Sequence, residues 1–312
     1  MLRSLSNPRF LRAVLPAVSL ALILGAIFAV NPRTMSSTGL NLLLQLAVPV
    51  ALATIAQMFI LAVNDLDLSI GGYVGLVACI GATFLNTDPL LGVVLLGACI
   101  AAYAVMGALI HWRNLPSIVV TLGMLFVWQG IAILVLPTPG GAAPGWIKAI
   151  MGFKPPLVPF PIVAAVVIAV VVHFALMRSS YGVILRGAGG NPRAVARAGW
   201  SLLKTKLAMY ALAGLFGVLS GLSLIGLTTS AQANIAMPYT LLSIAGAILG
   251  GSEFVGGRVS PIGAVIGALT LTLATRALTF FHVPPDWQIG AQGGILIIVL
   301  ALRALINRRE AA

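Results

Sequence analysis

The scarcest chemical groups of this chain are its acids, and two of them stand close together. Only six acidic residues occur among 312, and Asp65 and Asp67 both lie in the polar insert 64–69 between two apolar runs. An acid held at membrane depth is costly and often functional, so the insert is a candidate site. The simpler interpretation, which the spacing favours, is a helix cap. In it Asp67 or Ser69 accepts hydrogen bonds from the free N–H groups of the helix that contains Gly71.

The longest polar stretch, 178–206, is a second candidate site. It holds six basic residues and no acid. Asn191 followed by Pro192 is a helix-start signal, because Asn caps well and Pro fits the first helical position. Alanines follow, and Gly199 is a natural stop. The sequence predicts a short helix of about two turns here.

Arg193 and Arg197 are four residues apart, so they share one face of this predicted helix. Two functions fit that face equally well from the residues alone. The helix either anchors the neighbouring spans to anionic lipid or docks on a partner. The residues of interest in this segment are Gly190, Asn191, Pro192, Arg193, Ala194, Arg197 and Gly199.

A glycine-rich segment, 250–258, is the third candidate. Its glycines allow a sharp turn between two apolar runs, and Glu253 and Arg258 are placed to pair. A tight structural turn is the favoured interpretation, with a pathway role as the alternative. The residues of interest are Gly251, Glu253, Gly257 and Arg258.

Three further polar residues stand inside apolar runs. Arg276 either extends its charge to the membrane surface or lines a polar path. Gln57 and Gln129 suit helix–helix contacts first and a neutral polyhydroxyl solute second.

Several kinds of chemistry are excluded or not expected. The chain has no G-x-x-x-x-G-K-[ST] phosphate loop and no G-x-S-x-G elbow, and its three histidines have no metal-ligand spacing. We therefore expect no catalytic residue, no metal and no cofactor bound by this chain. A passive or externally powered translocation subunit is the leading class.

The composition sets the fold class. Hydrophobic residues make up 60% and charged residues 8%, whereas a soluble domain carries about 25% charged residues. This excludes a cytosolic enzyme, a secreted disulfide scaffold and a disordered chain. It predicts an all-α polytopic membrane protein, with residues 1–312 as a single transmembrane domain. The net charge of +12 belongs to cytoplasmic loops rather than to a nucleic-acid site.

The apolar runs predict about ten transmembrane helices, within a range of about 8–10. Most of the 18 Lys and Arg residues fall in inside segments if the N-terminus is inside, so both termini are expected to be cytoplasmic. The inserts 64–69 and 250–258 are the places where a re-entrant segment would change the count. The predicted spans are 11–30, 40–63, 70–85, 90–110, 116–136, 158–177, 207–227, 239–251, 261–281 and 287–302.

Four segments in the same order resemble one family. Residues 64–71 are similar to G-G-I-D-L-S-V-G, with Asn64-Asp65 in place of the glycine pair. Residues 189–199 are similar to G-G-N-P-E-A-A-R-x-x-G, with Arg193 in place of the acid. Residues 250–260 are similar to G-G-T-S-x-x-G-G-R-G-S, and 116–125 is also close to the family pattern. The chain thus resembles the membrane permease subunits of bacterial ABC importers for ribose, xylose, arabinose, galactose and related sugars.

This resemblance implies a multi-pass protein of the bacterial cytoplasmic (inner) membrane that works by alternating access. Its implied partners are a second permease subunit, identical or related, two cytoplasmic ATPase subunits that hold ATP and Mg, and a periplasmic or lipid-anchored sugar-binding protein. The helix at 192–198 looks like the coupling helix that docks on the ATPase. Alternative solutes are an autoinducer-type furanosyl compound or a branched-chain amino acid. An ion-coupled secondary carrier, with Asp65 and Asp67 as coupling sites, is the rival mechanism.

Overall fold

The computed structural model describes residues 8–155 and 158–284, together with isolated positions between 287 and 301. These residues form helices and turns, and none of them forms a β-strand. The helices are α2 (Pro8–Val30), η1 (Pro32–Met35), α3 (Ser37–Leu44), α4 (Ala47–Ala62), α5 (Ile70–Thr87), α6 (Pro89–Trp112), α7 (Ser117–Val135), α8 (Gly145–Met151), α9 (Phe160–His173), η2 (Phe174–Arg178), α10 (Ser180–Gly190), α11 (Pro192–Arg197), α12 (Leu202–Thr228), α13 (Tyr239–Leu249) and α14 (Pro261–Phe280).

The helices confirm an all-α polytopic membrane protein. Within the described part of the chain, six are long and apolar enough to cross a bilayer: α5, α6, α7, α9 with η2, α12 and α14. The bent pair α3 and α4 would make a seventh. Two apolar stretches, 16–30 in α2 and all of α13, are shorter. The number ten is therefore not reached among the described residues, and the predicted span 287–302 lies outside them apart from isolated positions.

The predicted second span, 40–63, is two helices rather than one. The axes of α3 and α4 differ by 42°. Pro49 lies in the first turn of α4 and has no N–H to donate to the preceding turn, so the helical ladder is interrupted there. A proline at this place explains the bend.

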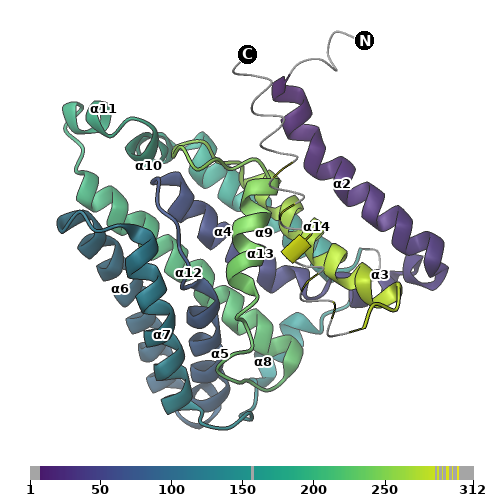
Figure 1. The fold of residues 1–312 in the computed structure, drawn as a ribbon. Helices are drawn as coiled ribbons and strands as arrows, with labels where there is room; N and C mark the ends of the chain where they lie inside the picture. Colours follow the sequence, from purple (N-terminus) through teal and green to yellow (C-terminus); the bar gives the residue numbers. More distant parts are fainter. Residues whose placement is uncertain are drawn as a thin grey trace.

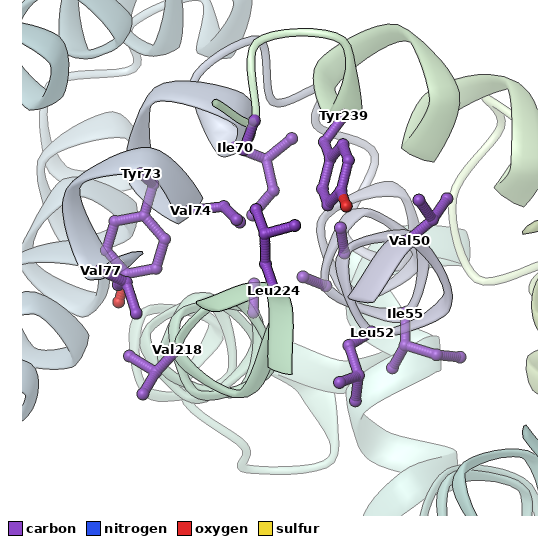
Figure 2. Close-up of a cluster of buried hydrophobic side chains, with 14 of the residues drawn as sticks. Val50, Leu52, Ile55, Ile70, Tyr73, Val74, Val77, Val218, Leu224 and Tyr239 are labelled. Carbon is purple, nitrogen blue, oxygen red and sulfur yellow. The ribbon is translucent and has the colours of Figure 1, made fainter. Parts of the chain in front are cut away.

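The core is built around α4, α5, α12 and α13. Every residue of α4 is buried. Figure 2 shows buried side chains of these four helices, with Val74 and Leu224 next to each other at the centre and Tyr239 close by. In contrast, α6, α7 and α9 turn many large apolar side chains outward, such as Leu90, Leu134 and Val171. Outward apolar faces suit contact with lipid.

The segments 136–159 and 178–206 contain two helices, α8 and α10, that were not predicted from the sequence. The loop after α7 contains α8, whose Ile147 and Met151 are buried. The basic segment contains α10 before the predicted short helix. Figure 1 shows α10 and α11 at the same end of the molecule as the beginning of α2.

Candidate functional site

The three motifs of the sequence meet at one end of the molecule. The last turn of α10, the C-terminal end of α4 and the turn 250–258 cross there with their backbones in contact. The Gly257 N–H donates to the Ala62 carbonyl at 2.8 Å. A Cβ on Gly189 would lie 1.9 Å from the same carbonyl oxygen and 3.0 Å from the Gly257 nitrogen. Only glycine fits at position 189, and we call this contact the glycine junction (Ala62, Gly189, Gly257).

The turn 250–258 reaches the junction through left-handed backbone. Gly256 and Gly257 both have φ of 71° and Gly251 has φ of 105°, conformations that side chains other than glycine rarely adopt. The predicted pair is confirmed, because Arg258 donates to Glu253 at 3.3 Å. The Ser252 hydroxyl is buried and has no hydrogen-bond partner among the described residues. Among the described residues, the turn is thus held mainly by backbone hydrogen bonds and by the Glu253–Arg258 ion pair.

The predicted short helix is confirmed as α11. The Asn191 side chain accepts a hydrogen bond from the Ala194 N–H at 3.1 Å, and Pro192 occupies the first helical position. Gly199 follows with φ of 83°, which ends the helix. Arg193 and Arg197 are exposed.

One side of α11 is packed against the rest of the chain. Val195 is buried, and α11 contacts α10 and the beginning of α12. The helix therefore presents two guanidinium groups to the outside while its inner side is linked through α10 to the glycine junction.

The insert 64–69 is a non-helical connector, and side chains satisfy several of its backbone groups. Ser117 accepts from the Leu66 N–H and Thr121 from the Leu68 N–H, each at 3.1 Å. The Gln57 side-chain amide can be oriented so that its NH₂ group donates to the Asp67 carbonyl. In that orientation its oxygen accepts from the Asp67 N–H. Non-helical backbone within a membrane domain needs such partners, because lipid offers none.

Asp67 lies at the centre of this connector and is fully buried. One carboxylate oxygen accepts hydrogen bonds from the Ser69 N–H and hydroxyl, both at 2.7 Å. The other oxygen accepts from the Tyr103 hydroxyl. Within the described parts of the chain no cation pairs with Asp67, so these hydrogen bonds alone compensate the cost of burying it.

The predicted cap is not formed, because neither Asp67 nor Ser69 accepts a side-chain hydrogen bond from an N–H of α5. Asp67 accepts from the N–H of Ser69, the residue just before α5, and Ser69 makes no side-chain cap bond of its own. The N–H of Gly71 is instead satisfied by the Thr240 hydroxyl of α13 at 3.1 Å. A residue far along the chain therefore supplies part of the cap.

Asp65 of the connector forms an ion pair with Lys206 of α12. Lys206 lies 2.7 Å from its carboxylate, and the Tyr210 hydroxyl donates to the same oxygen at 3.0 Å. Both charged side chains are largely buried, with 10% of Asp65 and 16% of Lys206 exposed. Lys206 and Tyr210 belong to α12, which follows α11 in the chain, so this pair is a second link between the basic segment and the connector.

The predicted pathway residues do not come together. Gln57 is fully buried and holds the connector. Gln129 of α7 donates to the Asn234 side chain at 2.6 Å, in the segment before α13. Arg276 lines a pocket beside η1 at the far end of α14. No group of three metal-ligating side chains gathers within the described residues.

Several residues that hydrogen-bond to the connector or to the start of α5 were not predicted from the sequence. Ser117 and Thr121 are four residues apart on α7, and that hydroxyl spacing was the only available signal. Tyr103, Tyr210 and Thr240 stand alone in apolar runs, where nothing in the sequence distinguishes them from core residues.

Comparison with known proteins identifies the class and then the family. A helical, multi-pass membrane domain with an exposed basic helix at one end fits a transport permease. Residues 39–300 match the family described as branched-chain amino acid transport system / permease component, and the chain belongs to this family. The match and the spanning helices together confirm a multi-pass protein of the bacterial cytoplasmic membrane.

Relatives of known name are import permeases. The galactose/methyl galactoside import permease protein of Salmonella typhimurium is 29% identical over 94% of this chain and 94% of its own length. The ribose import permease protein of Bacillus subtilis is 27% identical over 95% and 93%. The autoinducer 2 import system permease protein of an Enterobacter species is 26% identical over 90% and 89%. No solved structure matches this chain.

Proposed function

We propose that this chain is the membrane permease subunit of a binding-protein-dependent ABC importer, and that it moves a monosaccharide or similar small polyhydroxyl solute into the cytoplasm. The observation that carries the proposal is α11, a capped and exposed basic helix linked to the glycine junction. The galactose and ribose relatives support a sugar as the solute.

The geometry supports a route for coupling. A displacement of α11 passes to α10, and from Gly189 to the carbonyl end of α4 and to the turn 250–258. That turn joins α13 to α14, so the junction connects the basic helix to α4, α13 and α14. The Asp65–Lys206 pair makes a parallel connection through α12. Alternating access then follows from movement of the two partner ATPases.

The orientation and partners are part of the same proposal. The end that bears α10, α11 and the beginning of α2 faces the cytoplasm, as the excess of basic residues there suggests. Two ATPase subunits bind ATP and Mg and dock on α11. A second permease subunit completes the pathway, and a binding protein on the outer side selects the solute. In this scheme the chain itself binds no nucleotide and catalyses no reaction.

The coupling role is tested by charge reversal. We expect Arg193→Glu with Arg197→Glu to reduce the ATPase recovered with the tagged permease from native membranes by tenfold or more, since like charges then meet across the interface. Arg113→Glu is the matched control, because Arg113 is also exposed but lies outside α10, α11 and α12. Size-exclusion profiles establish that all variants fold. Normal assembly and ATP-driven transport by the double variant would contradict the proposal.

The solute and the energy source are tested by reconstitution. We expect uptake in proteoliposomes only when the ATPase, the binding protein and ATP are all present. Uptake by the purified chain alone would favour the ion-coupled carrier, although Asp65 is already paired with Lys206 and Asp67 is enclosed. The description of the matched family favours branched-chain amino acids as a second candidate. Ligands retained by the co-purified binding protein distinguish the two solute classes.

A further inference from the structure

A pocket of about 320 Å³ lies at the far end of α14, where η1 and α3 pack beside it. It has room for about ten water molecules. Two arginines, Arg33 and Arg276, line it. The other lining residues are Asn31, Thr34, Gly39, Leu42, Leu43, Thr279 and Phe280.

Among the described residues that line the pocket there are two arginines and no acid. Within the described parts of the chain no carboxylate forms an ion pair with Arg33 or Arg276. Two like charges that share a pocket repel each other, and an anion between them removes that cost. Guanidinium groups are suited to this, because each donates two parallel hydrogen bonds to a phosphate or carboxylate.

The position of the pocket is that of a bilayer interface. Arg276 stands one turn before the end of α14, a helix long enough to span, and η1 begins just after α2 ends at Val30. The surface near Arg33 is apolar, since Met35 and Leu42 are exposed by 57% and 59%. An apolar rim is unfavourable in water but favourable next to acyl chains.

We infer that this pocket binds the phosphate of an anionic phospholipid head group between Arg33 and Arg276, with the acyl chains against Leu42 and Phe280. The observations that support it are the two guanidiniums without an ion pair among the described residues, the apolar rim and the location at the end of a helix long enough to span. The inference does not rest on the proposed transport function and assigns Arg276 to lipid rather than to a solute path.

The test compares lipid retention by the purified full-length chain. Native mass spectrometry is performed after exchange into micelles that contain equal amounts of phosphatidylglycerol and phosphatidylcholine. We expect wild type to retain phosphatidylglycerol preferentially, and Arg33→Gln and Arg276→Gln each to weaken that retention about tenfold, as the loss of a charge-assisted hydrogen bond predicts. Lys148→Gln is the control, because Lys148 is an exposed cation of α8 that does not line the pocket.

Each other outcome overturns the inference in a distinct way. Equal retention by all four proteins would show that the pocket is not a lipid site. Displacement of the lipid by millimolar glycerol 3-phosphate, with no preference among intact lipids, would assign the phosphate chemistry to a soluble solute instead. Because Arg33 is exposed, Arg33→Gln keeps the test valid if Arg276→Gln fails to fold.

Discussion

The connector 64–69 and the turn 250–258 each join two helices at the same end of the molecule, but they satisfy their polar groups differently. The connector takes its hydrogen bonds from four other helices, through Gln57, Tyr103, Thr121 and Lys206 among others. The turn relies on left-handed glycines and on a pair formed within itself.

The two ion pairs show the same contrast. The Asp65–Lys206 pair is largely enclosed, with its charged atoms 2.7 Å apart. The Glu253–Arg258 pair is separated by 3.3 Å; only 12% of the Glu253 side chain is exposed, but 71% of the arginine side chain is. A pair with both groups enclosed is costly to break because the remaining charge is left in a poor solvent, whereas a cation that is mostly in water contributes little. The connector is therefore the part whose side chains determine stability, and the turn is the part whose backbone matters.

The largest loss of stability is expected at the glycine junction, which lies beside both regions. Gly189→Ala places a Cβ against the Ala62 carbonyl, which belongs to a helix backbone and has no room to move. We expect a loss of about 3 kcal/mol in stability, at the upper end of what overpacking costs, and a large loss of monodisperse protein. The measurement is the apparent Tm together with the size-exclusion profile.

The neighbouring glycine provides the matched control for that prediction. A Cβ on Gly190 would lie 3.8 Å from its nearest neighbours, which is ordinary contact. Gly190→Ala is therefore expected to fold like wild type. Equal Tm values for the two alanine variants would show that the glycine junction is not tight.

The second effect concerns the centre of the connector. Asp67→Ala leaves the Tyr103 and Ser69 hydroxyls without their buried acceptor, so we expect a loss of about 2 kcal/mol in stability. Asp67→Asn keeps one acceptor oxygen and should lose less. Thermal unfolding gives the order of the two variants, and reconstituted uptake shows whether solute preference changes. A stable Asp67→Asn protein with altered preference would indicate a direct pathway role instead.

The third effect tests the enclosed ion pair. Lys206→Met leaves Asp65 largely buried beside Tyr210 without its cation, and we expect a loss of about 1 kcal/mol, less than for a fully buried pair because both groups retain some exposure. Adding Asp65→Asn should recover part of the loss, since the stranded charge is then removed. A double-mutant cycle in apparent Tm measures this coupling. Additive losses would mean that the two residues do not interact.

Much of this arrangement could be predicted from the sequence, because it depends on interactions between residues that are close together in the chain. The cap of Asn191, the stop at Gly199 and the Glu253–Arg258 pair all join residues within a few positions of each other. The apolar runs likewise located most helices. The short α13 was predicted as well, at 239–251. The bend between α3 and α4 is a departure, and Pro49 explains it.

The partners of the connector could not be predicted in this way. Thr121, Tyr103 and Thr240 reach it from helices that are far apart in the chain, and each is a single polar residue in an apolar run. Periodicity shows that such a run is a helix, but it does not show which helix lies beside it. The pairing of Asp65 with Lys206 depends in the same way on packing of α12 against α4 and α5.

The smallest change in stability is expected for a side chain of the turn 250–258. Its size tests whether side chains matter less in the turn than in the connector. Arg258→Gln removes a guanidinium that is mostly in water, so we expect a change below about 0.5 kcal/mol in stability. The backbone bond between Glu253 N–H and the Arg258 carbonyl, 3.0 Å long, is retained in this variant. Apparent Tm should match wild type, while Gly257→Ala, at a φ of 71°, should unfold clearly earlier. A drop for Arg258→Gln as large as that for Lys206→Met would show that side chains hold the turn as firmly as they hold the connector.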